Sequence, residues 1–378
     1  MTRPLRVVQA IPSLDPAGGG PPVVVASLAV AQAAAGAEVT LAHGSPADSS
    51  ERVDKLLGSI PGATDLPIMH GSLADYLSDG NAADVVHLHG FWEPWLFSAA
   101  RAARSQKIPY VLTPHGMLHP WSLSQKRLKK FVALQFGYRA MLRRAALLHA
   151  LNEPERAILK GKAPNTPVEV IPNGVFLESF VSLPPAGAFR QQHPELIDAP
   201  VVLFISRLHY KKGLDILAEA FAIVAEKMPA ARLLVVGPDG GYEAEFRARV
   251  DRHGIAERVT MPGPQYGDAK LAALRDADLF CLPSRQEGFS IAITEALACG
   301  LPCVVSEDCN FPEVGEVGAG RITTLDPANV AEGILSVLSS PNPEALSQAG
   351  RDVVAERFTW PTVAETAFEK YRVGGIGA

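Results

Sequence analysis

Two glutamates that could hold the hydroxyl groups of a ligand lie eight positions apart in the segment RQEGFSIAITEALACG at 285–300. Glu287 falls in a loop after an apolar run, and Glu295 falls inside a predicted helix over 291–299. Ser290 precedes this helix, and its hydroxyl can accept a hydrogen bond from a free amide of the first turn. Glu295 then lies about 7–8 Å along the helix axis from this cap. The two carboxylates are therefore expected to bracket a ligand about the size of a sugar plus a ribose.

The backbone between the glutamates offers a second kind of contact. The amides of Gly288, Phe289 and Ser290 lie at the positive end of the predicted helix, which suits an anion or a hydroxyl oxygen. Acids near a helix N-terminus are also common where no ligand binds. A capping acid at Glu287 and a solvent-facing acid at Glu295 are therefore an equal alternative for this segment taken alone.

Three cations follow another apolar run, in the segment SRLHYKKGLDIL at 206–217. Arg207 leaves the predicted strand, and Lys211 and Lys212 come just before the glycine at which the next helix begins. Arginine can bridge two phosphoryl oxygens and lysine acts as a point charge, so such a loop can neutralise a diphosphate without a metal. Solvated surface charge is the alternative. The glutamates in the same predicted domain favour the diphosphate.

Short apolar runs alternate with helix-like segments along most of the chain, which indicates parallel sheets with crossover helices. The predicted strands of the first half cover 6–11, 38–43, 84–89, 109–114, 146–151 and 168–172. Those of the second half cover 201–206, 232–237, 258–263, 278–283 and 302–306. Ligands of such sheets bind beyond the carboxyl ends of the strands, which is where the cations and the glutamates fall.

The alternation pauses over 173–200, which is rich in turn residues and is interpreted as an interdomain linker. We expect two consecutive, doubly wound α/β domains that face a central cleft. The predicted domains cover 1–180 and 181–355, and a helix within 356–378 is expected to return to the first domain.

The composition is that of an ordinary globular protein, with a formal net charge of −5 over 378 residues. It gives no global basic footprint for nucleic acid, and no apolar stretch of about 18 residues predicts a spanning helix. The first residues show no secretory signal, so a cytoplasmic location is expected. Four cysteines without a C-x-x-C pair are interpreted as buried free thiols, namely Cys281, Cys299, Cys303 and Cys309.

Several blocks of the sequence resemble the family 4, or group 1, glycosyltransferases with the GT-B fold. They are SRLHYKKGLD, LLVVGPDG and PSRQEGFSIAITEALACGLPCV in the second half, and the glycine loop at 18–20, TPHGML and IPNGV in the first. These blocks cover nearly the whole chain in matching order. The string that begins PHGMLHPWSL resembles the branch found among bacterial exopolysaccharide and surface-glycan enzymes. The resemblance implies two Rossmann-like domains, an N-terminal one for the acceptor and a C-terminal one for the donor nucleotide.

The resemblance also implies roles for individual residues. Arg207 and Lys212 would hold the donor's diphosphate. Glu295 would hold the ribose hydroxyls, and Glu287, helped by the amides after it, the hydroxyls of the transferred sugar. His115 would contact the donor sugar from the first domain. Further contacts are expected from the glycine loop to phosphate and acceptor and from backbone near the base, at Gly18, Gly19, Gly20, Met261 and Gly263.

The implied reaction moves a hexosyl group from a UDP- or GDP-sugar to a glycan or a polyprenyl-diphosphate-linked acceptor, with retention and without a metal or other cofactor. No side chain needs to act as a nucleophile. In a front-face displacement the leaving phosphate accepts the acceptor's proton while the cations stabilise its charge. Ser206 and Ser290 stand where the family usually has glycine, and Ser290 leaves the identity of the donor more open than the activity.

Two patterns imitate metal sites. Asp276 and Asp278 form a D-x-D motif like that of a different glycosyltransferase fold, but they lie at a predicted helix end away from the cation loop. His87 and His89 share one face of a predicted strand, without a third ligand at a spacing suited to zinc. A hydrogen-bonded histidine pair is therefore favoured, with His89 near the acceptor.

Two features of the first half suggest contacts with the acceptor. Trp92 and Trp121 follow predicted strands and can stack on a sugar ring, although packing on the domain core is the alternative. The segment 126–144 carries seven basic residues and no acidic one, with apolar residues between them. It is either a solvated helix face or a surface that docks on anionic lipid, at the inner face of the cell membrane, or captures a lipid-diphosphate acceptor. Membrane insertion is not expected.

The leading interpretation is therefore a glycosyltransferase. A sugar-nucleotide epimerase could use a similar two-domain scaffold. A non-catalytic glycan-binding protein would be expected to lack Arg207, Lys212 or Glu295, all of which are present. A dinucleotide dehydrogenase is disfavoured because no G-x-G-x-x-G follows the first predicted strand.

Overall fold

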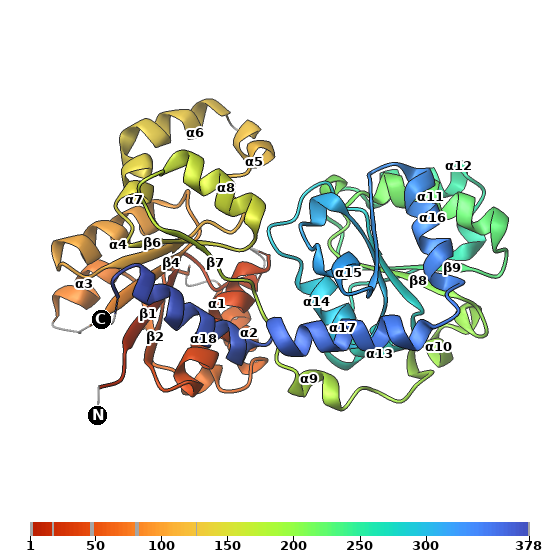
Figure 1. Ribbon diagram of the computed structural model, residues 1–378, viewed down its shortest axis with the longest axis horizontal. Helices are drawn as coiled ribbons and strands as arrows, with labels where there is room; N and C mark the ends of the chain where they lie inside the picture. Colours follow the sequence, from red (N-terminus) through yellow and green to blue (C-terminus); the bar gives the residue numbers. More distant parts are fainter. Residues whose placement is uncertain (1–2, 17–18, 46–48, 80–82, 126, 377–378) are drawn as a thin grey trace. The chain divides into compact units, whose positions relative to one another are not determined.

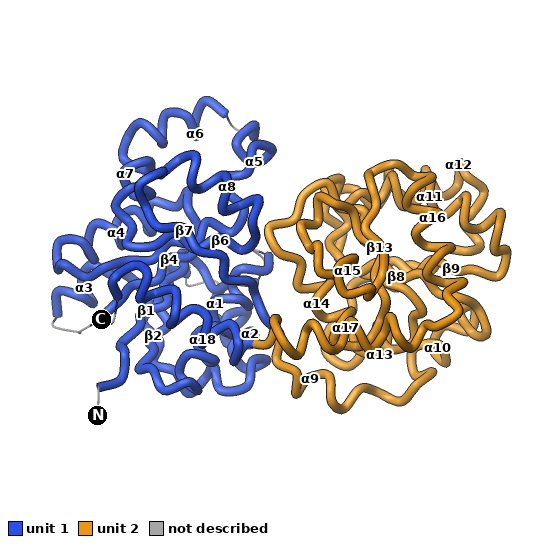
Figure 2. The backbone as a smooth tube through the Cα atoms, in the orientation of Figure 1, with its two compact units in different colours: residues 1–174, 360–378 blue, residues 175–359 orange. Residues whose placement is uncertain are grey.

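The computed structural model describes residues 3–16, 19–45, 49–79, 83–125 and 127–376. The chain divides into two compact units (Figure 2): unit 1 is formed by 1–174 together with 360–378, and unit 2 by 175–359. The sequence suggested boundaries at 180 and 355, so the chain enters unit 2 earlier and leaves it later than expected.

Unit 1 is built on a seven-stranded parallel sheet in the order β3-β2-β1-β4-β5-β6-β7. The strands are β1 (Arg6–Ile11), β2 (Glu38–His43), β3 (Ile68–His70), β4 (Val85–His89), β5 (Tyr110–Thr113), β6 (Leu147–Ala150) and β7 (Val168–Val170). The helices are α1 (Pro21–Ala34), α2 (Ser50–Gly58), α3 (Leu73–Ser78), α4 (Pro94–Ser105), α5 (Pro120–Ser124), α6 (Arg127–Ala133), α7 (Arg139–Arg143), α8 (Glu153–Lys162) and α18 (Trp360–Val373). A 3-10 turn, η3 (Ala63–Asp65), precedes β3, and a π-helical turn, η4 (Leu134–Tyr138), joins α6 to α7. The last helix, α18, packs against the first, α1 (Figure 1).

Unit 2 is built on a six-stranded parallel sheet in the order β10-β9-β8-β11-β12-β13. The strands are β8 (Val201–Ile205), β9 (Arg232–Val236), β10 (Val259–Gly263), β11 (Leu279–Leu282), β12 (Cys303–Ser306) and β13 (Gly320–Thr323). The helices are α9 (Glu178–Val181), α10 (Ala188–Gln192), α11 (Leu214–Lys227), α12 (Glu243–Arg252), α13 (Gly267–Asp276), α14 (Ile291–Ala298), α15 (Glu313–Glu316), α16 (Pro327–Leu338) and α17 (Pro343–Arg357). Short 3-10 turns are η5 (Pro194–Leu196), η6 (Tyr210–Lys212), η7 (Ala256–Arg258) and η8 (Glu307–Cys309).

The predicted pair of doubly wound α/β domains is confirmed. Every strand expected from the sequence is present, and the central ones are buried on both faces and read as continuous apolar runs. The sequence missed β3 and β13. Both are edge strands, and exposed side chains such as Ile68 and Ile322 interrupt their apolar pattern.

The strand order reverses between β1 and β4 in unit 1 and between β8 and β11 in unit 2. At such a switch point the two following connections leave on opposite faces of the sheet and open a crevice at the carboxyl ends of the strands. The glycine loop follows β1, and Arg207 and Glu287 follow β8 and β11. The fold therefore sets the candidate residues at the switch point of each sheet.

The structure corrects the prediction that 173–200 is an interdomain linker. Residues 175–200 belong to unit 2, and Phe189 and Leu196 are buried in its core. The Asp276 carboxylate accepts hydrogen bonds from the amides of Gly187 and Phe189, both at 2.7 Å, and so holds the start of α10. This segment escaped prediction because only a few apolar residues, widely spaced, attach it to the core.

The interior of unit 1 contains an unusual number of histidines. Burial lowers the pKa of His43 and of His149 to about 4, and that of His115 to about 3. It also holds the pKa of His87 and His89 well below the usual range. These rings are consequently neutral in the folded unit at ordinary pH.

These histidines predict that unit 1 is acid-labile. An unfolded histidine titrates near pH 6.5, whereas the folded ones do not, so the unfolded chain binds more protons below about pH 6.5. The free energy of unfolding should be highest above that pH. It should fall as the pH drops toward 4, by at most about 1.4 kcal/mol per pH unit for each histidine. Urea titrations between pH 7.5 and 5, followed by tryptophan fluorescence, should show this, because all four tryptophans lie in unit 1.

The variant His43→Asn should flatten the pH dependence, since it removes one of the groups that gain a proton on unfolding. A free energy of unfolding that stays constant from pH 7.5 to 5 would contradict the neutral state of these histidines.

Candidate active site

The cation loop and the first glutamate meet in unit 2. Lys212 ends the turn η6 after β8, and Glu287 lies in the loop after β11, the neighbouring strand. Lys212 Nζ donates to Glu287 Oε1 at 2.6 Å, and the Glu287 side chain is only 9% exposed. Arg207, which leaves β8 through Ser206, is exposed at the same edge. The fold thus brings together residues that are 75 positions apart in the sequence.

The second glutamate lies on α14 and has a partner that the sequence did not suggest. Ser290 caps α14 by accepting from the amide of Ile293, as predicted. Glu295 Oε1 accepts a hydrogen bond from Lys270 Nζ on α13 at 2.6 Å. Each glutamate of the pair is therefore held by its own lysine. No sequence signal pointed to Lys270, because α13 reaches α14 only through the tertiary fold.

Arg285 fixes the shape of the cation loop. Its guanidinium makes two hydrogen bonds to Asp215, at 2.8 and 2.6 Å, and lies 4.1 Å from the ring centre of Tyr210. Its amide donates to the carbonyl of Lys211 at 2.7 Å. Burial alone would raise the pKa of Asp215, but the bonds from Arg285 outweigh it and lower the pKa. The loop is consequently held in shape by contacts within the protein.

Two glycines allow the close approaches on which the loop depends. Gly213 adopts a φ of +70°, and a Cβ there would lie 1.8 Å from the carbonyl oxygen of Pro283. A Cβ on Gly240 would lie 2.8 Å from Arg207 Cγ, so the stem of Arg207 crosses directly over this glycine. Any side chain at either position would displace the cations.

The remaining donor-side candidates lie around the same edge. Gly263 has a φ of +83° at the end of the edge strand β10, and Met261 packs in part on the core of unit 2. The Phe289 ring packs against Phe311 at 5.5 Å and so belongs to the core. The Phe289 ring is thus engaged with the core and the Ser290 hydroxyl with the amide of Ile293, so the contacts expected here would come from the backbone amides.

In unit 1, His115 follows β5 with a φ of +51°, a left-handed conformation that few residues other than glycine adopt. Such strain is common at functional sites. The next amide, that of Gly116, donates to the buried carboxylate of Glu155 at 2.7 Å. Burial raises the pKa of Glu155, while its bonds to the amides of Gly116 and Leu151 oppose the rise. The pattern N-E-P-E, in which Asn152 caps α8, was a missed signal for Glu155.

The acceptor-side candidates of unit 1 have different surroundings. His89 is 1% exposed, and both of its ring nitrogens have partners, so it reaches the surface only through His115. The Trp92 ring lies beneath the Lys130 ammonium at 5.2 Å, and Trp121 is 38% exposed on α5. Gly19 and Gly20 precede α1, Gly19 with a φ of +106°. Gly18 lies outside the described residues.

The motifs that imitate metal sites have structural partners. Asp276 holds α10, and Asp278 pairs with Arg190 at 2.9 Å. The rings of His87 and His89 lie 4.2 Å apart but form their hydrogen bonds with other groups, which corrects the expected histidine pair. Among the residues that the structure describes, no group of three or more metal-ligating side chains is found.

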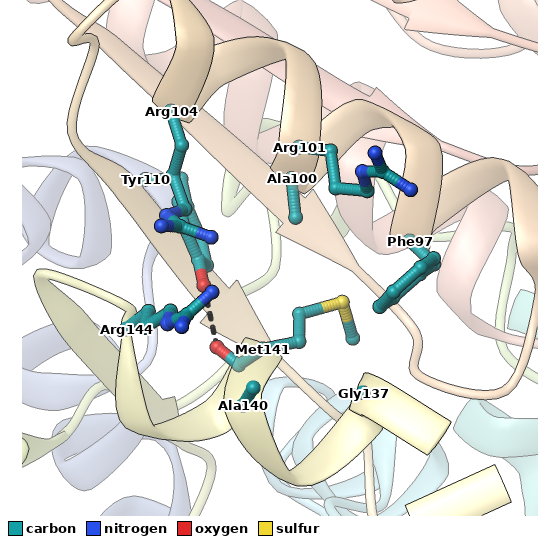
Figure 3. Close-up of a pocket in the computed structure, with 9 residues that line it drawn as sticks. All are labelled: Phe97, Ala100, Arg101, Arg104, Tyr110, Gly137, Ala140, Met141 and Arg144. Carbon is teal, nitrogen blue, oxygen red and sulfur yellow. Dashed lines mark hydrogen bonds between the residues drawn. The ribbon is translucent and has the colours of Figure 1, made fainter.

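A cavity of about 360 Å³ lies between α4 and α7 of unit 1, with an aromatic and aliphatic floor (Figure 3). Arg101, Arg104 and Arg144 line it. Inside it the Tyr110 hydroxyl donates to the carbonyl of Met141 at 2.5 Å. Tyr110 begins β5, whereas His115 follows the carboxyl end of the same strand. The cavity therefore lies at the amino ends of the strands of unit 1, whereas His115 lies at their carboxyl ends.

Comparison with known proteins identifies both units. A family model described as glycosyl transferases group 1 matches residues 187–353, and one described as glycosyl transferase 4-like domain matches residues 19–174. The phosphatidyl-myo-inositol mannosyltransferase of Mycobacterium leprae is 29% identical over 333 residues, which cover 83% of this chain and 79% of that protein. The D-inositol 3-phosphate glycosyltransferase of Segniliparus rotundus is 34% identical over 213 residues, but the match spans only 46% of that protein and 54% of this chain.

Solved structures share the whole fold at low sequence identity. Anabaena Alr3699/HepE in complex with UDP superposes with a TM-score of 0.79 at 20% identity, covering 97% of this chain and 100% of that one. A glycosyltransferase from Rickettsia africae superposes with a TM-score of 0.76 at 17% identity over 100% of both chains. The two glycosyl transferase models, 4-like over 19–174 and group 1 over 187–353, together match most of the chain, and the solved structures share its two-domain GT-B fold, so the chain belongs to the glycosyltransferases that combine these two domains.

Proposed function

We propose that this glycosyltransferase moves a hexosyl group from a UDP- or GDP-sugar to a glycan or a polyprenyl-diphosphate-linked glycan, with retention and without a metal, in bacterial polysaccharide synthesis. The observation that carries the proposal is the Lys212–Glu287 pair, which joins a diphosphate-binding cation to a sugar-binding carboxylate at 2.6 Å. A sugar attached to a diphosphate held by Lys212 and Arg207 has its hydroxyls within reach of Glu287.

The second ion pair extends the same site toward the nucleoside. Glu295 lies about one and a half helical turns beyond the cap of α14, and its carboxylate suits the two hydroxyls of a ribose. The base would then lie near Met261 and Gly263 at the edge strand. Ligand binding would give the two glutamates hydroxyl groups as partners in place of the lysines, and would give Lys212 a phosphate oxygen in place of Glu287. Both lysines stay close enough to neutralise the donor.

The transfer step needs no protein nucleophile. The acceptor hydroxyl attacks the anomeric carbon on the face from which the diphosphate departs, so the new C–O bond replaces the old one on the same side. The acceptor's proton passes to the departing phosphate oxygen. Arg207 and Lys212 stabilise the negative charge that grows on the diphosphate, and His115 is proposed to contact the sugar.

The comparisons support this chemistry in general terms. The Anabaena protein was solved with UDP and with UDP-glucose, and the mycobacterial relatives are named for the transfer of sugars to phosphatidyl-myo-inositol. A sugar-nucleotide epimerase remains the alternative reaction. Release of nucleoside diphosphate only after a glycan acceptor is added would support transfer. Interconversion of donor sugars without an acceptor would support the epimerase.

Replacing Lys212 tests the donor site. Lys212→Ala should lower kcat/KM by about 10²–10³-fold, because it removes a charge that stabilises the leaving diphosphate. The fold should persist, as judged by circular dichroism and the melting temperature. Lys227→Ala, at the exposed end of the same helix that follows the loop, is the matched control and should retain full activity. Near-normal turnover by the Lys212→Ala enzyme would rule out its role at the diphosphate.

Metal removal tests the second part of the proposal. If Arg207 and Lys212 supply the charge, turnover should be unchanged after treatment with EDTA and gel filtration. A loss of turnover that added Mn²⁺ restores would show that a cation is required. Asp276→Asn and Asp278→Asn would then show whether the D-x-D motif holds that cation.

We further propose that unit 1 docks on an anionic membrane at the cytoplasmic face. Among the described residues, Leu128, Phe131 and Phe136 of α6 and η4 are 78%, 58% and 77% exposed. Basic residues surround them, and no acidic residue occurs between 94 and 152. Apolar side chains in a basic surround bind the interface of an anionic bilayer. No helix in the described part of the chain has the length and hydropathy needed to cross a membrane.

Vesicle sedimentation tests this docking. The protein should pellet with vesicles that contain phosphatidylglycerol, less so at high salt, and should stay in solution with phosphatidylcholine alone. The double variant Leu128→Ser/Phe131→Ser should lose most of the binding. Val181→Ser/Ile197→Ser, which changes side chains of unit 2 that are 81% and 50% exposed, should bind normally. Equal binding by both double variants would contradict docking through α6.

A further inference from the structure

A continuous chain of hydrogen bonds runs through the interior of unit 1 from His115 to the C-terminal helix and back to the sheet. Its buried members are contributed by strands β1, β4, β5 and β6 and by helices α1 and α18. They are Gln9, Gln32, His87, His89, Thr113, His149 and Tyr371, each at most 2% exposed. The donor-sugar candidate His115 is half-buried at one end.

The contact between His149 and Ile171, at the end of this hydrogen-bond chain farthest from His115, fixes the direction of donation along it. His149 Nε2 lies 2.6 Å from the carbonyl oxygen of Ile171, which can only accept, so this nitrogen carries the hydrogen. Because His149 is neutral, its Nδ1 is an acceptor. The facing atom, His87 Nε2 at 3.3 Å, must then be a donor, and it lies 2.7 Å from the Thr113 hydroxyl as well. His87 Nδ1 is left to accept from the Tyr371 hydroxyl at 2.8 Å.

The same argument assigns donor and acceptor to the remaining hydrogen bonds, from Tyr371 back to His115. Having donated to His87, the Tyr371 oxygen accepts from Gln32 Nε2 at 3.1 Å. Gln32 Oε1 accepts from Gln9 Nε2 at 2.6 Å. Gln9 Oε1 accepts from His89 Nε2 at 2.6 Å. His89 therefore has a bare Nδ1, to which His115 Nε2 must donate at 3.0 Å.

We propose that this relay holds His115 as its Nε2–H tautomer, with a bare Nδ1 that accepts a hydrogen bond from a substrate hydroxyl, and that Tyr371 of α18 is a positioning residue for it. In the opposite direction His87 Nε2 would be bare and accept from the Thr113 hydroxyl, so two nitrogen lone pairs, those of His87 Nε2 and His149 Nδ1, would face each other at 3.3 Å. The lowered pKa values of the histidines exclude the doubly protonated ring, which would have no preferred tautomer. No hydrogen bond from a described residue reaches His115 Nδ1.

The substrate part of this inference rests on the proposed function, whereas the tautomer does not. A bare Nδ1 selects a hydroxyl group and disfavours a phosphate oxygen, because two acceptors repel each other. His115 would accordingly contact a sugar hydroxyl and not a phosphate. A change at Tyr371 would alter recognition at His115 without contact between the two residues.

Nitrogen NMR measures the tautomer directly. In protein labelled with ¹⁵N-histidine, with the His115 signals assigned by their loss in His115→Gln, Nε2 should show a protonated shift and Nδ1 an unprotonated one. Tyr371→Phe should give a mixture of both tautomers at His115, because the bonds from Gln32 to His115 are then no longer tied to the Ile171 carbonyl. A protonated Nδ1 in the natural protein, or an unchanged tautomer in the variant, would overturn the relay.

Tyr110→Phe is the matched control. Tyr110 is also a buried tyrosine of unit 1 whose hydroxyl donates to a carbonyl, that of Met141, but it is outside the relay. It should lower the melting temperature as Tyr371→Phe does and leave the His115 signals unchanged. In assays of transfer, Tyr371→Phe should lower kcat/KM roughly tenfold, the effect of one hydrogen bond, and Tyr110→Phe should not.

The two measurements separate the possible failures. If the tautomer of His115 shifts in Tyr371→Phe but no nucleotide sugar supports transfer by the natural protein, the relay stands and the proposed function fails. If transfer occurs and Tyr371→Phe leaves kcat/KM unchanged despite a shifted tautomer, the recognition of a hydroxyl by His115 is wrong.

Discussion

Parallel strand order is the constraint on which the candidate site depends. Each crossover returns the chain to the same end of the sheet, so the connections that leave neighbouring strands converge whatever their distance in sequence. Lys212 and Glu287 meet in this way after β8 and β11. Both glutamates have a lysine partner at 2.6 Å. The half-buried carboxylates are thus never left uncompensated, and binding exchanges one set of polar partners for another.

Local patterns in the sequence predicted the parts of the site that are local. The Ser290 cap, the position of Glu295 on α14 and the strand ends before each functional loop follow from spacing and side-chain chemistry within about ten residues. Lys270 and Gln9 could not be found in this way, since each acts through an element that only the folded sheet brings near, whereas Glu155 was missed although it forms a local capping pattern with Asn152. The edge strands β3 and β13 were missed for a related reason: half-exposed strands lack the continuous apolar run of the central ones.

The histidines of β4 show how a motif can mislead. Two imidazoles on one strand face suggest a metal or an isolated pair, but the neighbouring strands supply further polar groups at the same level of the sheet. Gln9 lies opposite His87 in the β1–β4 register, and Thr113 lies opposite His89 in the β4–β5 register. A buried polar network is stabilising only when every member has a partner, which explains why glutamine, threonine and tyrosine side chains occupy positions that would otherwise be apolar.

Helix α18 gives unit 1 a discontinuous chain, with 1–174 and 360–378 separated by the whole of unit 2. On the ribosome, unit 2 is therefore complete before unit 1 can be. Until Tyr371 has emerged from the exit tunnel, Gln32 and His87 lack their buried partner and the face of α1 that α18 covers is exposed to water. The first domain to be synthesised is thus the last to mature. Its incomplete core therefore stays exposed to water for longer during synthesis than that of unit 2.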